Sequence, residues 1–310
     1  MKILVTGGAG FIGSHVVDAY LGEGHEVVVA DNLITGRKKN LNPDAKFVEL
    51  DIRDESISDL FDAEQFDVVN HHAAQMDVRK SVEDPGYDAE VNVLGSLNVL
   101  ENCVRTGVQK CIFASTGGAI YGEQDYFPAD EEHPQRPLSP YGITKLSLEK
   151  YLYYYHQIHA LDYFVLRYAN VYGPRQNPHG EAGVVAIFAR KLLEGGQPVI
   201  YGDGKQTRDF VYVGDVVRSN LRALEYEGSD MVNIGTGIET DVNRIFRELQ
   251  EITGRDDIPE KHEEGKPGEQ RRSVILNRKA GEVLDWEPQV SLTEGLKQTV
   301  EYFKSQVEMA

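Results

Sequence analysis

The sequence predicts an α/β protein built on a doubly wound parallel sheet, with a second, smaller α/β part. Three observations support this prediction. Short apolar strands alternate with helix-length segments through the first half of the chain, a glycine-rich turn follows the first strand, and the alternation loosens after residue 173. Strands separated by helices form right-handed βαβ units and hence a parallel sheet. A chain of 310 residues, 41% of them hydrophobic, can bury a large core.

Each expected strand is a short apolar run bounded by polar or turn residues. The runs cover residues 2–7, 25–31, 46–52, 66–74, 110–116 and 163–173. The segments between them have the length of helices, so we expect them to cross from one parallel strand to the next. Two glycine-rich polar stretches then precede helical patterns at about 241–253 and 291–307. We expect this last part to cover the carboxyl ends of the strands, where open α/β sheets bind ligands.

A glycine-rich turn joins the first strand to the first helix. Gly7, Gly10 and Gly13 permit a tight turn, let backbone N–H groups approach a pyrophosphate, and allow the helix to pack closely on the strand. Asp31 ends the second strand about twenty residues further on, as a dinucleotide fold requires. Its carboxylate would accept hydrogen bonds from ribose hydroxyls and repel a 2′-phosphate. The pattern therefore predicts a Rossmann domain that binds NAD in preference to NADP.

Other polar residues near these strand ends are weaker candidates for cofactor contacts. The basic run 37–39 offers an alternative partner for a phosphate, but we expect the Asp31 carboxylate to dominate. Asp51, near the end of the third strand, is a candidate for the adenine edge, with an ordinary strand-end cap as the alternative. We also expect cofactor contacts from residues beside these positions, namely Phe11, Ile12, Asn32 and Ile52.

Charge and composition exclude several classes of protein. A formal net charge of −18 repels a polyphosphate backbone and no basic stripe is visible, so we expect small-molecule partners and no nucleic acid. Cys103 and Cys111 lack metal spacing, as do the histidines, so no metal is expected. No stretch has the pattern of a signal peptide or the length of a membrane span, which favours a cytoplasmic protein without a membrane partner.

Several motifs follow one another along nearly the whole chain. Besides the glycine turn they are "HHAAQ", "STGGAIYG", "YGITK", "LRYANVYGPR", "YGDGKQTRDFVYV" and "NIGTG". In this order they resemble the extended short-chain dehydrogenase/reductases, and among these the UDP-glucose 4-epimerase-like sugar-nucleotide epimerases. The resemblance implies an NAD-dependent isomerase that inverts C4 of a UDP-sugar through a transient 4-keto intermediate.

The resemblance also implies roles for residues at matching positions. The expected cofactor contacts are Ala73, Ala74 and Gln75 at the nicotinamide-side ribose, Asn92 near the cofactor, and Tyr168 beside the nicotinamide. The expected substrate contacts are Asn170, Val184, Val185, Tyr201, Arg208, Lys266 and Glu269. Arg208 would pair with the diphosphate, because a guanidinium suits phosphate oxygens. For Asn170 and Arg208 the alternative is a loop hydrogen bond or a surface ion pair.

"SPYGITK" places Tyr141 and Lys145 on one face of a helix, since positions i and i+4 are neighbours there. A lysine cation and an oxidised nicotinamide both stabilise a phenolate, and so lower a pKa that is ordinarily about 10. Tyr141 would then act as a base near neutral pH, while Lys145 also hydrogen-bonds the nicotinamide ribose. Because Tyr-x-x-x-Lys also occurs by chance, this assignment depends on the cofactor fold upstream.

The fifth strand ends in Ser115 and Thr116, either of which could donate a hydroxyl to the reacting sugar oxygen. We expect Thr116 to be this third catalytic group. Ser115 stays as the alternative, because the motif has one more residue before Tyr121 than the commoner family pattern. Residues 117–119 carry no acid where related dehydratases and decarboxylases have carboxylates. This absence favours simple epimerisation.

The nature of the sugar is less sharply predicted. Lys266 and Glu269 stand where the family often has Arg and Asp. Both keep the charge of the usual residue, so UDP is favoured, although Lys lacks the bidentate geometry of Arg. A small residue at Ser273 would admit an N-acetyl group, so we expect UDP-glucose and UDP-galactose, and also UDP-GlcNAc and UDP-GalNAc. The alternatives are a UDP-uronic acid 4-epimerase and a net NAD-dependent oxidoreductase. A non-catalytic NAD sensor is disfavoured because Tyr141 and Lys145 are both present.

We expect two domains without a low-complexity linker. An NAD-binding Rossmann domain would take residues 1–170 and about 209–237, and a sugar-nucleotide-binding domain about 171–208 and 238–310. The helices expected around 84–107 and 141–157 are apolar enough to offer a second face. The resemblance implies a homodimer that pairs these helices.

Overall fold

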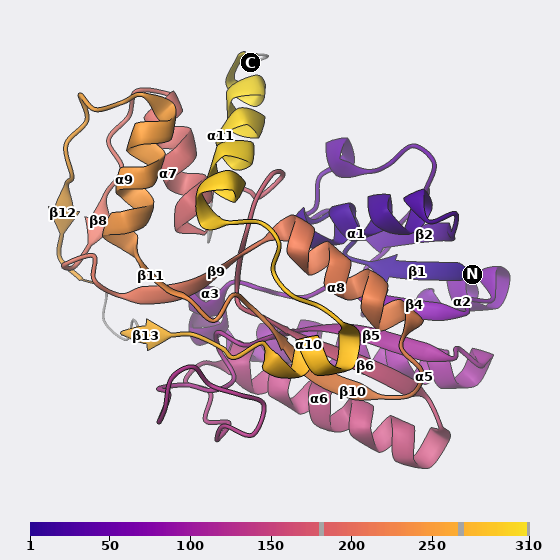
Figure 1. Ribbon diagram of the computed structural model, residues 1–310. Helices are drawn as coiled ribbons and strands as arrows, with labels where there is room; N and C mark the ends of the chain where they lie inside the picture. The colour runs from indigo at the N-terminus through magenta and orange to yellow at the C-terminus, as the bar shows by residue number, and fades with distance from the viewer. Residues whose placement is uncertain (180–182, 266–269, 309–310) are drawn as a thin grey trace.

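A computed structural model describes residues 1–179, 183–265 and 270–308 and contains a large parallel sheet and a smaller mixed one (Figure 1). The large sheet has seven strands in the order β10-β6-β5-β4-β1-β2-β3. They are β1 (Lys2–Thr6), β2 (Glu26–Asp31), β3 (Lys46–Glu49), β4 (Val68–His71), β5 (Lys110–Thr116), β6 (Asp162–Tyr168) and β10 (Asp230–Ile234). Every pairing is parallel, which confirms the doubly wound sheet.

The large sheet is buried on both faces, which explains why its strands are continuous apolar runs. In β1, Ile3 and Val5 belong to one apolar cluster and Leu4 to the other, and all three are fully buried. The first cluster includes residues of α1 (Phe11–Gly22), α8 (Val213–Glu225) and α10 (Arg278–Leu284). The second includes residues of α2 (Ile57–Glu64), α5 (Ser96–Thr106) and α6 (Pro140–His159). Alternate residues of one strand thus anchor helices on opposite faces.

Short helical segments connect β4 to α5 beside the sheet. They are α3 (Val78–Glu83), α4 (Pro85–Ala89) and a π-helical turn, η2 (Glu90–Gly95), which runs directly into α5. A 3₁₀ turn, η1 (Lys38–Asn40), follows β2. The Ser-Pro pair does start α6, because the Ser139 hydroxyl accepts a hydrogen bond from the N–H of Gly142 at 3.2 Å and Pro140 is the first helical residue.

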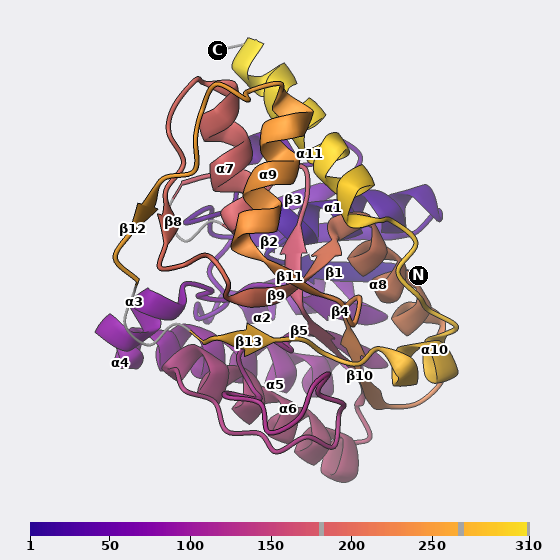
Figure 2. The same ribbon diagram turned by 60° about the vertical axis from the view of Figure 1, so that its left-hand side comes forward.

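The smaller sheet and its helices lie beyond the carboxyl end of β6 (Figures 1 and 2). Its strands are β7 (Asn170–Tyr172), β9 (Thr207–Tyr212), β11 (Glu239–Asp241) and β13 (Arg272–Ser273), and a separate pair is formed by β8 (Ile200–Tyr201) and β12 (His262–Glu263). Three helices share a third apolar cluster with this sheet, namely α7 (Val184–Leu193), α9 (Val242–Thr253) and α11 (Leu292–Glu308). The helices α9 and α11 match the two helical patterns expected in this part.

The single strand expected over residues 163–173 is wrong. The chain leaves the large sheet after Tyr168, where the N–H of Ala169 donates to Ile234 O at 2.9 Å, and then pairs Asn170–Tyr172 with β9 in the smaller sheet. One residue, Ala169, thus separates the two sheets. β9 lies in the smaller sheet, whereas α8 and β10 lie with the large one, and the domain boundaries stay a prediction. Among the described helices, none has the length and hydropathy needed to cross a bilayer.

Candidate active site

The glycine turn after β1 is too crowded for side chains. Gly7 has a φ of +71°, and a Cβ there would lie 2.7 Å from Ala73 N. A Cβ on Gly13 would lie 2.4 Å from Gly7 O. Gly10 caps α1 without a side-chain hydrogen bond, so the first N–H groups of this helix remain for an anion. The next residues, Phe11 and Ile12, are half-buried in the first turn.

Asp31 lies against this turn. Its Oδ2 accepts the N–H of Ala9 at 3.0 Å and its Oδ1 accepts the N–H of Leu33 at 2.8 Å. Burial raises the pKa of this carboxyl, while the two backbone N–H groups act to lower it. Each carboxylate oxygen can accept a further hydrogen bond, so Asp31 can both fix the turn and bind ribose hydroxyls.

Asp51 lies just beyond β3 and close to Asn32. The side chain of Asn32 donates to Asp51 Oδ2 at 2.8 Å, and Arg53 binds the same carboxylate through Nε and Nη2, each at 2.9 Å. The Arg53 guanidinium holds the pKa of Asp51 well below its usual range. Ile52 is buried under Gly95, where a Cβ would lie 2.9 Å from Ile52 Cδ1.

The segment after β4 is fixed by a buried polar network. Ala73 donates its N–H to Thr6 Oγ1 at 3.2 Å, and Ala74 beside it is half-buried. The side chain of Asn92 in η2 forms two hydrogen bonds with the backbone of Gln75. Its Oδ1 accepts the N–H of Gln75 at 2.8 Å, and its Nδ2 donates to the carbonyl of Gln75 at 2.9 Å. π-Helical turns of this kind are frequent at functional sites.

Asp88 connects this network to α6. Its Oδ1 accepts hydrogen bonds from Gln75 Nε2 at 2.9 Å and from Asn92 Nδ2 at 3.1 Å. Its Oδ2 accepts the hydroxyl of Thr144 at 2.9 Å. The side chains of Gln75 and Asn92 therefore hold the strand end in place, and Asp88 and Thr144 are members of the site that the sequence did not indicate.

Lys145 is a buried cation one turn after Tyr141. Its Nζ donates to Ala114 O at 2.9 Å, and lies 4.7 Å from the Phe113 ring centroid and 6.0 Å from the Tyr141 ring centroid. Burial lowers the pKa of Lys145 to about 8, although the negative charges of Asp88 and Glu149 act in the opposite direction. A positive charge is thus held beside the phenol ring in a site from which water is largely excluded.

The two hydroxyls at the end of β5 have different environments. Ser115 is buried and its Oγ donates to Glu149 Oε1 at 2.6 Å. Thr116 is half-buried. Its Oγ1 and Asn170 Oδ1 border the same space over Gly118, since a Cβ there would lie 3.8 Å from the first atom and 3.9 Å from the second. Adjacent strand residues point to opposite faces, so only Thr116 faces an expected substrate contact.

A buried ion pair lies on the Ser115 side of the strand. Arg167 is fully buried and binds Glu149 through Nε at 3.0 Å and Nη2 at 2.6 Å. Arg167 Nη1 also donates to the Tyr121 hydroxyl at 2.9 Å, which in turn donates to Asn233 Oδ1 at 2.7 Å. This network links β5, α6, β6 and β10 beneath the catalytic candidates.

Tyr168 ends β6 with its hydroxyl engaged. It accepts a hydrogen bond from Asn220 Nδ2 at 2.8 Å and lies 3.2 Å from His72 Nε2. The His72 and Tyr168 rings stack at an interplanar angle of 23°. Burial raises the pKa of Tyr168 and lowers the pKa of His72 to about 3, so both groups are neutral at physiological pH.

The expected substrate contacts come from the smaller part of the chain. Asn170 is exposed on β7 and Tyr201 is exposed on β8. Val184 and Val185 start α7, the first half-buried and the second buried. Arg208 lies half-buried on β9, pairs in register with Ser273 of β13, and donates from Nη1 to Thr207 O at 2.8 Å. Lys266 and Glu269 lie outside the described residues.

Asp209, next to Arg208, was not indicated by the sequence. This buried carboxylate accepts the N–H of Thr236 at 2.8 Å and its hydroxyl at 2.6 Å through Oδ1, and the N–H of Gly237 at 3.1 Å through Oδ2. It joins β9 to the loop that follows β10, and so connects the smaller sheet to the large one.

The expected cofactor and catalytic residues meet because the strands are parallel. Gly7, Asp31, Ala73, Thr116 and Tyr168 lie at or just after the carboxyl ends of β1, β2, β4, β5 and β6. All these ends share one edge of the sheet, on either side of the point between β1 and β4 where the strand order reverses. The smaller sheet starts at the same edge and can cover a ligand bound there.

Comparisons with known proteins agree with this geometry. A model of the NAD dependent epimerase/dehydratase family matches residues 3–235. A UDP-glucose 4-epimerase of Mycolicibacterium smegmatis is 45% identical over 311 residues, covering 98% of this chain and 99% of the relative. A crystal structure of the Thermotoga maritima UDP-glucose 4-epimerase with UDP-glucose matches at 51% identity and a TM-score of 0.97, covering 99% and 100%. The Thermus thermophilus UDP-glucose 4-epimerase in complex with NAD matches at 44% identity and 0.93, covering 98% and 99%.

Proposed function

The chain belongs to the NAD dependent epimerase/dehydratase family, and on this premise we propose that it interconverts UDP-glucose and UDP-galactose by inverting C4 of the sugar. Its cofactor is NAD. The observation that carries the proposal is Lys145 of α6, whose Nζ binds Ala114 O of β5 at 2.9 Å and lies 6.0 Å from the Tyr141 ring centroid. Thr116 ends the same strand, and residues 117–119 after it carry no acid. Relatives named UDP-glucose 4-epimerase at 45% and 51% identity support the choice of sugar.

The residues present fit NAD. Side chains at Gly7 and Gly13 would fill the space in which a pyrophosphate approaches the backbone, and the uncapped start of α1 favours its negative charge. The Asp31 carboxylate suits the adenosine ribose hydroxyls, and Asp51 with Asn32 suits the adenine edge. NAD, when bound, would supply hydride-transfer chemistry, as the acceptor of the C4 hydride and its donor after the sugar has turned.

The protein's own residues move the proton of the C4 hydroxyl and orient the reacting oxygen. Tyr141 takes the proton of the C4 hydroxyl, because the buried Lys145 cation 6.0 Å from its ring stabilises the phenolate. Thr116 hydrogen-bonds the reacting oxygen from β5. Ser115 is not proposed for this role, because its hydroxyl is bound to Glu149. The 4-keto sugar turns about its link to the diphosphate, and Tyr141 returns the proton after inversion.

The smaller part holds the sugar nucleotide during this turn. Arg208 on β9 would pair with the diphosphate, while the start of α7 and Tyr201 would contact the nucleotide. Asn170 borders the same space over Gly118 as Thr116 and would hold the sugar. Ser273, the register partner of Arg208, is small, so we propose that an N-acetylated sugar is also accepted.

The test uses purified protein without added NAD. It is incubated separately with UDP-glucose, UDP-GlcNAc and UDP-glucuronic acid, and the products are identified by chromatography. We expect UDP-galactose from the first and UDP-GalNAc from the second. A product from UDP-glucuronic acid alone would replace the proposal by a uronic-acid epimerase. A parallel incubation with added NAD completes the test, because stoichiometric consumption of that NAD would replace the proposal by a net oxidoreductase.

A matched pair of variants tests the role of Tyr141. Removal of a catalytic base costs about 10²- to 10⁴-fold in rate, so Tyr141→Phe should lose that much of kcat. Tyr153→Phe, on the exposed side of the same helix, should keep the wild-type rate. Equal rates for the two variants would contradict the proposal.

We further propose a cytoplasmic homodimer. Four large side chains of α6 are 48% to 63% exposed, namely Ile143, Tyr153, Tyr154 and Ile158, and exposed apolar groups of this kind mark interaction surfaces when they gather on one element. Cys103 and Cys111 are free and buried, which fits a reducing compartment. Light scattering should give twice the monomer mass for the wild type and a monomer for Tyr154→Arg/Ile158→Glu. A monomeric wild type would contradict the dimer.

A further inference from the structure

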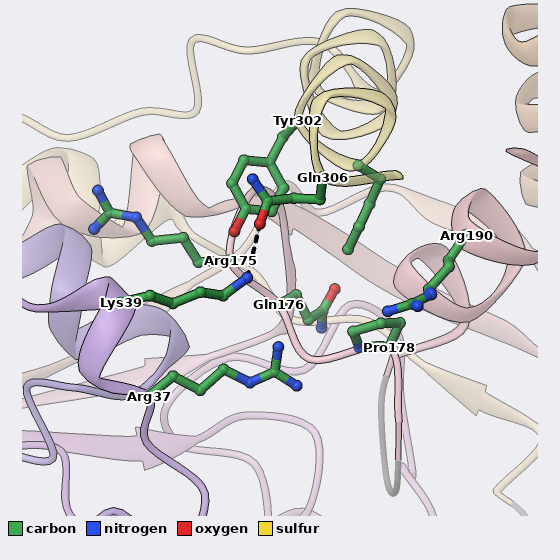
Figure 3. Close-up of a pocket in the computed structure, with 9 residues that line it drawn as sticks. Arg37, Lys39, Arg175, Gln176, Pro178, Arg190, Tyr302 and Gln306 are labelled. Atoms are coloured by element: carbon green, nitrogen blue, oxygen red, sulfur yellow. Dashed lines mark hydrogen bonds between the residues drawn. The ribbon is translucent and has the colours of Figure 1, made fainter. Parts of the chain in front are cut away.

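A basic hollow lies apart from the residues assigned above, between η1, the loop after β7, α7 and α11 (Figure 3). Its described lining consists of Arg37, Lys39, Arg175, Gln176, Pro178, Arg190, Tyr302, Phe303 and Gln306. No acidic residue is among them, although the chain has 50 acidic against 32 basic residues. Cations that gather in one hollow repel one another and attract an anion, so the cluster suggests a binding site.

Two of the four cations of the hollow bind neutral amides, and the other two bind carboxylates outside it. Arg37 Nη2 donates to the neutral Asn177 Oδ1 at 2.5 Å, and Lys39 Nζ donates to the neutral Gln306 Oε1 at 2.7 Å. Arg190 binds Glu194 one turn along α7, at 2.7 Å and with both side chains partly exposed. Arg175 is different, because it turns away toward Asp18, which it binds at 2.7 Å.

These side chains converge from separate elements. Figure 3 shows Arg37 and Lys39 entering from one side and Arg190 from the other, with Tyr302 and Gln306 of α11 above them. Burial raises the pKa of the Tyr302 hydroxyl, although the charges of Arg175 and Arg37 act to lower it. Tyr302 keeps its proton at neutral pH and can donate it in a hydrogen bond.

We propose that this hollow binds a phosphate group, free or carried by a small metabolite, through Arg37, Lys39 and Arg190. Two guanidinium groups, an ammonium and a phenol supply charge-assisted donors from several directions, which suits a tetrahedral dianion better than a planar carboxylate. Asp31 does not line the hollow, so the site is distinct from the expected position of the adenosine ribose.

A phosphate bound here would join the cofactor side of the molecule to the substrate side. The N–H of Arg37 donates to Ala9 O at 2.9 Å, and the N–H of Ala9 donates to Asp31 at 3.0 Å, so η1 is attached to the glycine turn. Arg190 lies on α7, whose first residues are the expected substrate contacts Val184 and Val185. The site therefore lies where an effector can influence how the two parts fit together.

Calorimetry on the NAD-bound protein tests the proposal. UDP is kept saturating so that the sugar-nucleotide site is occupied, and sodium chloride holds the ionic strength constant. Inorganic phosphate and glucose 1-phosphate are titrated in separate arms, which distinguish a free phosphate from a phosphate ester. We expect at least one of them to bind at one site per chain, and Arg37→Gln and Arg190→Gln each to weaken it about tenfold or more.

Matched controls come from neighbouring cations that do not line the hollow. Lys38 and Lys191 precede or follow lining residues on the same elements and are exposed, so Lys38→Gln and Lys191→Gln remove the same charge. Their affinities should stay within about twofold of the wild type, because surface charges contribute little. Absence of binding in both arms, or equal weakening by the lining and control variants, would overturn the proposal. Because Arg190 is partly exposed, its variant tests the site even if Arg37→Gln fails to fold.

Discussion

Ser115 and Thr116 are adjacent in β5, yet their hydroxyls have different environments and different proposed roles. Ser115 completes the hydrogen bonding of the buried Glu149 carboxylate, whereas Thr116 lies beside Asn170. The sequence left both open as the third catalytic group, because a motif read along a strand does not say which face a residue takes. The burial of Glu149 and Arg167 on one side of the strand supplies that information.

Two single substitutions separate these roles. Thr116→Val keeps the shape but removes the hydroxyl, so kcat should fall by about 10²-fold with little change in stability. Ser115→Ala leaves Glu149 short of one donor, so it should lower the free energy of unfolding by about 1–3 kcal/mol with kcat nearly unchanged. Steady-state kinetics and urea unfolding of both variants measure the two effects. The reverse pattern would assign catalysis to Ser115.

Lys145 should make stability depend on pH in a defined direction. Its pKa is about 8 in the folded chain against an ordinary value of 10.5. Between these values the unfolded chain binds more protons, so the unfolding free energy of the wild type rises with pH relative to that of Lys145→Met. The slope should approach about 1.4 kcal/mol per pH unit between pH 8 and 10.5, and it should vanish below pH 8, where the cost of burying the cation is fully present.

Urea unfolding of both proteins from pH 7 to 10 gives this difference directly. Other titrating groups are common to the two proteins and cancel. Parallel stability curves over the whole range would show that the lysine pKa is not lowered by folding.

At the scale of elements, the apolar pattern predicted six regions of strand and the helices between them, but not where a strand ends. The pattern of 163–173 has no break at Ala169, because both β6 and β7 carry apolar residues and only their partners differ. β10 and the short strands of the smaller sheet were not predicted. Nor does local sequence show that Asp88 and Thr144, 56 residues apart, share a hydrogen bond.

Substitutions at two glycines of α1 test whether NAD binding requires close packing of this helix on the turn after β1. Gly13→Ala places a Cβ 2.4 Å from Gly7 O, so the helix must move and the purified protein should carry little NAD. Gly22→Ala meets no atom within 4 Å and should raise the free energy of unfolding by about 0.5–1 kcal/mol, because alanine loses less entropy in a helix. NAD released by heating and measured by chromatography, together with melting temperatures, checks both. Retention of NAD by Gly13→Ala at the wild-type level would contradict the proposed pyrophosphate site at the glycine turn.

At the scale of the molecule, two sheets meet at the carboxyl edge of the larger one. The sequence predicted that the later part of the chain covers this edge, since the cofactor motifs come first and the glycine-rich segments of the smaller part follow them. It did not predict the connection through Asp209, whose partners lie 27 and 28 residues away. Short-range motifs identify residues that bind ligands more readily than residues that hold two layers together.

Asp209→Asn should therefore loosen the smaller sheet without touching the reacting atoms. We expect KM for UDP-glucose to rise about tenfold, with a smaller change in kcat, because the three hydrogen bonds between the layers lose the negative charge of their acceptor. Asp203→Asn is the control, since Asp203 is exposed and pairs with Arg271 at 2.8 Å on the surface. A fall in kcat at constant KM would place Asp209 in the chemical step instead.

The short passage through Ala169 limits how far Asn170 can move. Asn170 starts β7 two residues after Tyr168 ends β6, so its backbone stays close to the carboxyl end of the large sheet. The residue expected to hold the sugar is therefore fixed by the cofactor-binding layer as well as by the layer that it belongs to.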